Sequence, residues 1–456
     1  MGIRARLGGW RRRSQPGYAA FIEQVEPDLL HAGRLHRFAE PPRLLGRPGP
    51  PPGVSGAEDL GPQAMAPATG APEWVVQVDP GYRLHPEAVL QFARATAAAG
   101  DVALITCDHD HLDAAGARHS PVLRPGPSPD FASAPSPVRA VRRGGEGHAH
   151  LPLVLAHRVG EPQERPPPPV PAAPAPSSEP AVEVIVCLRD EPALLERCAG
   201  SLLSVTEYQR LTLRLVDNAS ERRETAEVLG RLAGDPRVVV DHDPRPFNFS
   251  ALNHAAAGRS GADVLVFLNN DTEITDPGWI EGLLAQALRP EVGAVAPLLL
   301  YPDGRVQHAG VAIGLHGWAG HPFAGLGPDE PTPFGSAAGG IRNWMAVTAA
   351  CLMVERRKYL EVGGFDPAFE VGGGDVDLCL RLTAAGYRSL SVPAISVIHD
   401  ESATRDPAKI PPGDFEASRR SYGEFRTAGD PFYHPALTLQ DTTCRLRRAG
   451  EPEPGP

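Results

Sequence analysis

From residue 181 onward, short apolar runs alternate with segments of helical spacing, and this alternation limits the possible folds more than any other feature. Strands that alternate with helices of roughly 10–15 residues predict a parallel α/β sheet. The strands have no polar face, as expected when helices cover both sides of the sheet. The expected strands are residues 181–188, 211–217, 237–241 and 262–268, and the expected helices are residues 192–204, 221–233, 248–258 and 279–288.

The sequence beyond this alternation also predicts regular structure. The expected elements are extended segments at 293–304 and 308–317, helices at 355–364 and 375–387, and an extended run at 388–400. A turn at "PDG", which begins at Pro302, separates the first two segments. On the amphipathic helix 375–387, Asp377 and Arg381 have the i,i+4 spacing of a surface ion pair.

A stretch rich in proline and alanine, "EPQERPPPPVPAAPAPSSEP", precedes this region. Such a composition cannot form a packed core and predicts a semi-extended linker. We therefore expect an irregular segment at 1–70, a partial α/β domain at 71–160, the linker at 161–180, the main α/β domain at 181–440 and a disordered tail at 441–456.

The composition excludes several classes of protein. A formal net charge of −11, from 44 basic and 55 acidic residues, argues against a general nucleic-acid-binding protein. The six cysteines form no CxxC pair, which predicts buried thiols in a reducing compartment. Because there is no apolar run of about 18 residues and no signal-peptide core, we expect a cytoplasmic protein. The basic start "MGIRARLGGWRRR" predicts a solvated tail, with peripheral contact to the inner face of the cell membrane as the alternative.

Polar side chains gather at the carboxyl ends of two expected strands, where ligands bind in open α/β sheets. They are Asp217 and Asn218 after one strand, and Asn269, Asn270, Asp271 and Glu273 after the other. For Asp217 alone, ordinary turn chemistry is an equal alternative. The second cluster favours a site, because one turn rarely needs so many polar groups. Since the chain has no glycine-rich phosphate loop, a divalent cation would supply the counter-charge for a phosphate ligand, with Asp271 as its natural ligand.

An ordered series of segments across residues 181–440 resembles the family 2 glycosyltransferases, particularly the bacterial rhamnosyltransferase-like and O-antigen-type branch. The series includes "VEVIVCLRDEPALLERCAGSLL", "LRLVDNAS", "PFNFSALNHAAAG", "VLVFLNNDTEITDPGWIEGLL", "GDVDLCLRLTAAGYR" and "VIHDESATR". The resemblance implies a GT-A fold, in which a nucleotide-binding α/β sheet merges with an acceptor-binding half. It also implies an inverting, metal-dependent transfer of a sugar from a nucleotide-diphosphate sugar to a hydroxyl of a glycan or lipid-linked acceptor, in cell-surface polysaccharide synthesis.

The resemblance implies a role for each matching residue. Asp375 matches the catalytic base, Asp271 matches the metal ligand, and His399 matches the residue that completes metal or diphosphate binding. The implied cofactor is Mn²⁺ or Mg²⁺. The implied donor-binding residues are Arg189, Asp190, Asp217, Asn218, Asn253, Asn269 and Asn270.

Three positions depart from the family pattern. "CL" precedes Arg189 where the family usually has Pro-Thr, His254 stands where an Asn is usual, and Gly374 replaces a polar residue. The first departure affects the pocket for the nucleobase. The second affects the contacts to the diphosphate, and the third affects the loop before Asp375, which it is expected to loosen.

Several alternatives remain open at this point. Asp375 could be only a helix N-cap, Asp377 is the second candidate for the base, and His399 could be a structural histidine. His308 and His321 receive no role. A non-catalytic nucleotide-sugar-binding protein is the alternative function. A two-carboxylate glycoside hydrolase is disfavoured, because it needs no nucleotide-type sheet.

The N-terminal part, residues 71–160, resembles the middle and end of a degenerate, shortened first domain of tandem family members. After Asp79 the family's acid pair is replaced by "PGY". The acidic cluster Asp108, Asp110 and Asp113 is interpreted as a solvated turn rather than a metal site. We expect a non-catalytic remnant that packs against or tethers the main domain. A chain that starts near residue 176 should then keep donor binding.

Overall fold

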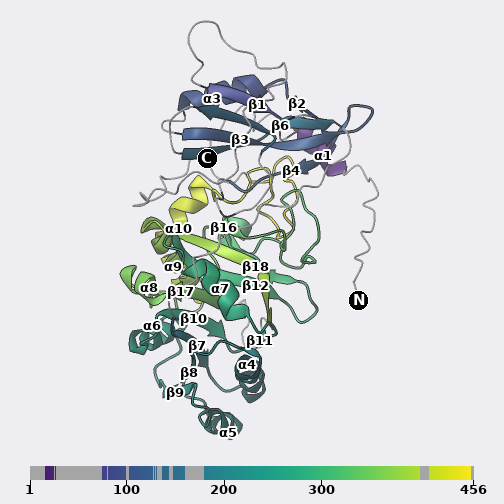
Figure 1. The fold of residues 1–456 in the computed structure, drawn as a ribbon. Coiled ribbons are helices and arrows are strands. Elements are labelled where there is room, and N and C mark those ends of the chain that lie inside the picture. The colour runs from purple at the N-terminus through teal and green to yellow at the C-terminus, as the bar shows by residue number, and fades with distance from the viewer. Residues whose placement is uncertain are drawn as a thin grey trace.

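The computed structural model describes residues 16–24, 26, 74–79, 81–98, 102–126, 128, 130, 136–142, 147–159, 179–400 and 410–452. The basic start, most of the linker, residues 401–409 and residues 453–456 lie outside the described residues. A six-stranded sheet near the N-terminus lies above a ten-stranded sheet in the view of Figure 1.

The ten-stranded sheet is a mixed sheet with a parallel block. Its order is β11 (Thr272–Ile274), β18 (Arg388–His399), β12 (Val292–Leu300), β17 (Cys351–Glu355), β10 (Val264–Asn269), β7 (Val182–Leu188), β8 (Leu211–Asp217) and β9 (Val238–His242), with β13 (Val306–His308) beside β12 and β16 (Arg342–Trp344) beside β18. β10, β7, β8 and β9 are parallel, as the alternation predicted. β17 is antiparallel to both of its neighbours, β10 and β12.

Both faces of this sheet are buried. In β10, Leu265 and Phe267 enter one hydrophobic cluster, whereas Val264 and Val266 enter another. Neighbouring strand residues point to opposite faces, so the two clusters lie on the two sides of the sheet. The helices are α4 (Pro192–Val205), α5 (Arg223–Leu232), α6 (Phe249–Arg259), α7 (Trp279–Ala287), α8 (Arg356–Glu361), α9 (Gly374–Ala384) and α10 (Pro412–Ala428). The predicted α/β class is confirmed.

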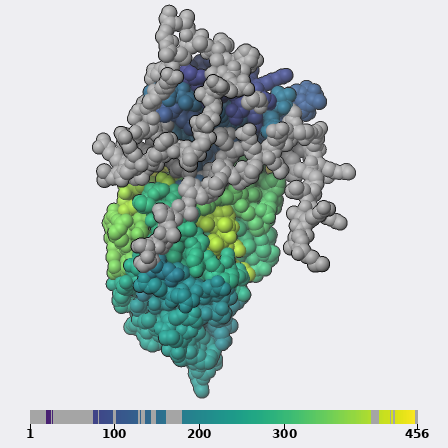
Figure 2. All heavy atoms as spheres, viewed as in Figure 1, coloured from purple at the N-terminus to yellow at the C-terminus, as the bar shows by residue number. Residues whose placement is uncertain are grey.

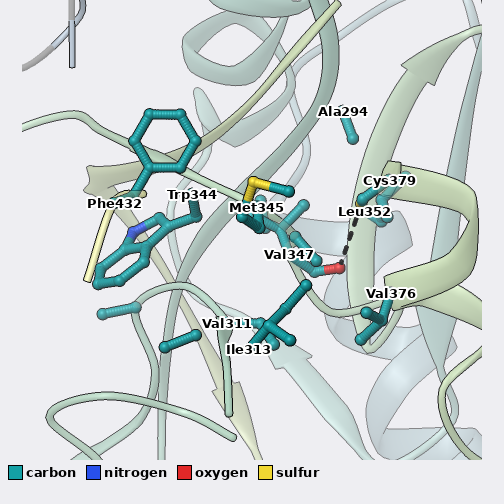
Figure 3. Close-up of a cluster of buried hydrophobic side chains, with 14 of the residues drawn as sticks. Ala294, Val311, Ile313, Trp344, Met345, Val347, Leu352, Val376, Cys379 and Phe432 are labelled. Carbon is teal, nitrogen blue, oxygen red and sulfur yellow. Dashed lines mark hydrogen bonds between the residues drawn. The ribbon is translucent and has the colours of Figure 1, made fainter. Parts of the chain in front are cut away.

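Hydrophobic packing also fixes the start of α9 (Figure 3). Val376 and Cys379 of α9 belong to the same buried cluster as Val347 and Leu352. The Cys379 Sγ lies 3.8 Å from the Val347 carbonyl oxygen. This packing ties the first turn of the helix, which carries Asp375, to the centre of the sheet.

The N-terminal part is β-rich. Its strand order is β1 (Trp74–Val78), β5 (Val138–Arg142), β3 (Val102–Leu112), β6 (Gly147–Val159) and β2 (Tyr82–Leu84), with β4 (Arg118–Val122) beside β3. Among the described residues of this part, α3 (Ala88–Ala98) packs on β3 and β6, and α1 (Pro16–Gln24) lies by β4.

The interpretation of Asp108 and Asp110 as a solvated turn was wrong. Both lie inside β3 and are fully buried. The Asp110 carboxylate contacts Arg118 Nε at 2.6 Å and His157 Nδ1 at 2.5 Å, and these partners compensate its burial. Asp113 lies in an exposed turn, as predicted, and its carboxylate accepts the backbone N–H of Ala115.

The expected disordered tail was also wrong over residues 441–452, which are described and pack against the main domain. Cys444 is buried, and Leu446 forms a β-bridge with Leu437. The Phe323 N–H donates to the Thr442 carbonyl oxygen at 2.7 Å.

A buried carboxylate joins the N-terminal part to the main domain (Figure 2 shows the blue N-terminal part above the green and yellow main part). Asp130 is 2% exposed, and its oxygens lie 2.5 Å from Arg289 Nη2 and 2.9 Å from Arg388 Nε. Asn343 Nδ2 donates to the same carboxylate at 2.7 Å. The expectation that a chain starting near residue 176 keeps donor binding stays a prediction. Because such a chain would lack Asp130 and its contacts, we expect it to be less stable than the full chain.

Replacing Asp130 with alanine is expected to destabilise the protein by about 3 kcal/mol, the low end for breaking a buried ion pair. Arg289 would stay buried and, among the described residues, would keep Glu291, 2.7 Å away, as its anionic partner. Denaturant unfolding measures the loss, with Asp329→Ala at an exposed position as control. A loss no larger than the control's would mean that Asp130 does not hold the two parts together.

Candidate active site

Asp271 and His399 meet at the carboxyl end of β10. β11 follows directly after Asp271 and pairs antiparallel with β18, so that Thr272 lies opposite His399. Asp271 Oδ1 and His399 Nε2 are 3.2 Å apart, and each residue is 4% exposed. Strand pairing therefore brings together two predicted site residues that are distant in sequence.

The electron pairs of these two side chains face one another. His399 Nδ1 lies 3.1 Å from Gln307 Oε1, so Nδ1 carries the proton and donates it, and Nε2 keeps its lone pair. Asn269 Nδ2 lies 3.3 Å from Nε2 and can donate to it. Asp271 Oδ1 is buried and has no hydrogen-bond donor among the described residues. A buried carboxylate oxygen beside an imidazole lone pair fits a divalent cation, and the Gln307 contact is the usual orienting bond of a metal-binding histidine.

Asp375 lies in the first turn of α9, close to the same strand end. The N-cap position belongs to Gly373, whose φ of 86° favours glycine, so the N-cap alternative for Asp375 was wrong. The Ala349 N–H donates to Asp375 Oδ2 at 3.1 Å. The next residue, Ala350, accepts the Asn269 N–H at 3.0 Å. Asp375 and the end of β10 are therefore attached to neighbouring residues of one loop.

Asp377, the second candidate for the base, is fully occupied by other contacts. Its Oδ2 contacts Arg381 at 2.6 Å, and its Oδ1 accepts the Ser421 hydroxyl at 2.6 Å. The predicted i,i+4 pair with Arg381 is confirmed, but Asp377 is buried rather than on the surface. Both of its oxygens bind other side chains, whereas the Asp375 oxygens accept only the backbone N–H groups of Ala349 and Val376 among the described residues. Asp375 is therefore the better candidate for the base.

The loop before Asp375 is held by Asp414 of α10, a residue that the sequence analysis missed. The backbone N–H groups of Glu370, Val371 and Gly372 each donate to the Asp414 carboxylate at 2.8 Å. Asp414 is buried. The available signal was "PPGD" at 411–414, with proline at the helix start and an acid in the first turn. These contacts counter the loosening expected from Gly374.

The other end of α10 is anchored by a second buried carboxylate, Asp430. Its oxygens accept the N–H groups of Ile313 and Phe432 at 2.8 Å each. Burial raises the pKa of Asp430 to about 7, and the backbone donors offset only part of that rise. The unfolded chain would lose this proton near pH 4, so the folded state gains stability below pH 4 that is lost as the pH rises through 7.

Asp430→Asn is therefore expected to flatten the stability profile between pH 5 and 8. The wild-type protein should lose on the order of 2 kcal/mol over this window through Asp430, whereas the neutral variant should not. Thermal unfolding at four pH values measures the difference, and Asp329→Asn is the exposed control. Parallel profiles for the wild type and Asp430→Asn would contradict the assignment.

Four of the predicted donor-binding residues lie together at the ends of β7 and β8. The Asn218 N–H donates to the Leu188 carbonyl oxygen, which joins the two strand ends. The Asp217 carboxylate contacts the Ser220 N–H and His242, and the Asn218 amide donates to the carbonyl oxygens of Asp243 and Arg245. The Asp190 carboxylate accepts the N–H groups of Glu221 and Arg222. Arg189 forms an ion pair with Glu221. Arg189 is the exposed member of the group.

The remaining predicted donor-binding residues lie elsewhere. Asn269 and Asn270 are half-buried beside Asp271. Asn253 is buried within α6, where its amide donates to the Phe249 carbonyl oxygen at 2.9 Å. The helix that carries Asn253, α6, packs against β7 and β8.

Two further histidine groups lie in the interior, and all their members except the half-buried His321 are buried. His308 Nδ1 and His321 Nδ1 are 2.8 Å apart, and burial holds the pKa of His308 well below its ordinary value. Asp108, His150 and His434 place their ligating atoms within 4.8 Å of one another. Although burial alone raises the pKa of Asp108, the two histidines hold it below its ordinary value.

The Asp108 cluster does not fit a metal ion. His434 Nδ1 accepts the Ala436 N–H at 3.0 Å, so the ring proton is on Nε2, which donates to Asp108 at 2.8 Å. A metal at Nε2 would displace that proton. The cluster is instead a hydrogen-bonded link between the N-terminal part and the main domain.

Comparison with known proteins gives three kinds of similarity. Residues 183–345 match glycosyl transferase family 2. The chain is 38% identical to the O-antigen biosynthesis protein RfbC of Myxococcus xanthus, over 82% of this chain and 34% of that protein. It is 35% identical to an N-acetylglucosaminyl-diphospho-decaprenol L-rhamnosyltransferase of Mycobacterium tuberculosis, over 33% of this chain and 52% of that protein. The chain thus spans between a third and a half of these relatives.

A solved structure of GalNAc-T7 with UDP, GalNAc and Mn²⁺ is also similar, with a TM-score of 0.44 and 16% identity over 58% of this chain and 53% of that one. The RfbC alignment covers more of the chain than residues 181–456 do, so it extends into the N-terminal part. In the described part of the chain, no helix is long and apolar enough to span a membrane.

Proposed function

We propose that the chain is an inverting, metal-dependent glycosyltransferase of family 2, and the match of residues 183–345 to glycosyl transferase family 2 supports this. It moves a sugar from a nucleotide-diphosphate sugar to a hydroxyl of a glycan or lipid-linked acceptor, in cell-surface polysaccharide synthesis. The named activities of the O-antigen and rhamnosyl relatives support this class. The observation that carries the proposal is the buried Asp271–His399 pair, whose facing lone pairs suit a cation. The same strand end is joined through Ala350 to the loop that binds Asp375.

The metal end of the site is built by this chain's own side chains. Asp271 Oδ1 and His399 Nε2 would hold Mn²⁺ or Mg²⁺, which when bound neutralises charge on a departing diphosphate. Gln307 fixes the His399 tautomer. The Asn269 amide, 3.3 Å from Nε2, would release this nitrogen when the cation binds. Burial of both ligands excludes competing water.

Asp375 supplies the base. The acceptor oxygen forms a bond to the anomeric carbon as the bond from that carbon to the diphosphate oxygen breaks, and Asp375 takes the acceptor's hydroxyl proton. The Ala349 N–H holds one carboxylate oxygen, and Asp414 holds the loop before it. A positioned base of this kind contributes about 10²–10⁴-fold.

Calorimetry with UDP and dTDP, with and without Mn²⁺, tests the proposal. We expect nucleotide binding that requires the cation and is lost in EDTA. Binding that ignores EDTA would overturn the metal site. Slow release of sugar from a bound nucleotide sugar distinguishes a transferase from the alternative, a non-catalytic nucleotide-sugar-binding protein.

A further inference from the structure

A cationic and aromatic surface lies on α10, outside the site described above. It consists of Trp318, Phe415, Arg419 and Arg426, and we name it the Trp318 surface. The guanidinium carbon of Arg426 is 4.2 Å from the centre of the Trp318 ring, and that of Arg419 is 5.4 Å from it. The Phe415 ring centre is 4.9 Å from that of Trp318. Stacking of this kind restrains both arginines.

Trp318 brings the members on α10 together. Phe415 and Arg419 are four residues apart and share a face of the helix, whereas Arg426 lies beyond a kink at Tyr422 and is placed by its contact with the Trp318 ring. Trp318 comes from a short loop in which the exposed residue His316 has a φ of 54°. Non-glycine residues in this region are strained and persist only where the surroundings enforce them. The loop is enforced by the His316 N–H, which donates to the Leu439 carbonyl oxygen at 2.9 Å.

Among the side chains that the structure describes, which do not include that of Glu424, neither arginine has a carboxylate partner, although the chain carries a net charge of −11. Arg419 is exposed, and Arg426 is half-buried. Their planar N–H groups suit two-point recognition of phosphate oxygens. Because stacking already restrains the side chains, less rotamer entropy is lost when an anion binds.

The Trp318 surface lies beside the loop that leads to the base. Asp414 binds the backbone of residues 370–372, and a Cβ on Gly373 would lie 3.0 Å from Ser418 Oγ. Phe415 and Arg419 are the residues that follow Asp414 and Ser418. Phe415 and Arg419 are therefore one residue away from the contacts that position the loop before Asp375, on the neighbouring face of α10.

We propose that the Trp318 surface binds the phosphate or diphosphate group that links the acceptor glycan to its carrier. This inference rests on the proposed function, in which Asp271 and His399 serve the donor diphosphate. A second anion site beside the base loop then serves the other substrate. It predicts that the acceptor is an anionic, phosphate-linked glycan rather than a neutral oligosaccharide.

The test is a titration of the full chain with inorganic pyrophosphate at low salt, in which the dissociation constant for pyrophosphate is measured. EDTA is present so that metal-dependent binding at the donor site does not contribute. Arg419→Gln/Arg426→Gln should weaken pyrophosphate binding at least about tenfold, because two charge-assisted contacts are lost. Arg420→Gln, at an exposed position next to Arg419, should change pyrophosphate binding less than about twofold. Mn²⁺-dependent UDP binding should stay unchanged in both variants and shows that they are folded.

Equal pyrophosphate binding by the wild type and the double variant would overturn the inference. If the double variant fails to fold, Arg419→Gln alone gives the same test, because Arg419 is exposed. A double variant that no longer binds phosphatidylglycerol vesicles but still binds pyrophosphate like the wild type would assign the surface to a membrane. That result would also overturn the proposal. Failure of the proposed function is distinct: the wild type would then show no Mn²⁺-dependent UDP binding.

Discussion

Asp271→Ala is expected to abolish Mn²⁺-dependent nucleotide binding and to lower sugar transfer at least about 100-fold, while the protein stays folded. Asp271 supplies the buried carboxylate oxygen that has no hydrogen-bond donor among the described residues and faces the His399 lone pair. Removing it removes the one anionic ligand of the pair. Calorimetry with UDP and Mn²⁺ measures binding, and a nucleotide-sugar assay measures transfer.

The unfolding temperature of the metal-free protein provides a second test of the Asp271→Ala variant. A buried carboxylate oxygen without a donor costs free energy, so Asp271→Ala should leave the apo unfolding temperature unchanged or raise it. Glu273→Gln, a half-buried acid on β11, is the matched control and should keep metal-dependent binding. Unchanged Mn²⁺ dependence in Asp271→Ala would remove this residue from the metal site.

The sequence predicted the parallel block well because its signal is local. Continuous apolar runs such as β10 are required wherever helices cover both faces, and the eight elements expected between residues 181 and 288 are all present. β17 and α10 were missed for different reasons. β17 is a short apolar run that periodicity cannot assign, and α10 exposes much of its surface, so its sequence is mostly polar.

Asp108 shows why the N-terminal prediction failed. Charged residues are rarely fully buried unless they are paired, so a cluster of acids favours a turn. One partner of Asp108, His434, lies 326 residues further along the chain, in a segment expected to lie near the end of the other domain. No local pattern can reveal a pair at that separation. The same holds for Asp130, whose partners Arg289 and Arg388 belong to the main domain.

The sequence named candidate site residues but not the residues that hold them in place, and the roles of the candidates stay predictions. Family resemblance indicated Asp271, Asp375 and His399, and the structure brings Asp271 and His399 into contact through the pairing of β11 with β18. The supporting residues Gln307 and Asp414 carry no motif of their own, because their roles come from contacts with distant parts of the chain. Physical reasoning from sequence finds ligands more readily than the groups that orient them.

Asp375→Asn is expected to lower the rate of sugar transfer by about 10²–10⁴-fold while nucleotide binding stays nearly intact. The variant keeps the shape of the side chain, and its amide oxygen can still accept the Ala349 N–H. What it loses is the capacity to take the acceptor proton, a property needed only as the new bond forms. The effect should therefore fall on kcat rather than on the dissociation constant for the donor.

Glu370→Gln is the matched control for this variant, because Glu370 is an exposed acid on the same loop whose backbone, not its side chain, contacts Asp414. It should leave kcat within about twofold of the wild type, as expected for a surface substitution outside the site. Asp377 cannot take over in Asp375→Asn, since both of its oxygens are held by Arg381 and Ser421. Near-normal turnover in Asp375→Asn would therefore place the base outside α9 and remove Asp375 from the reaction.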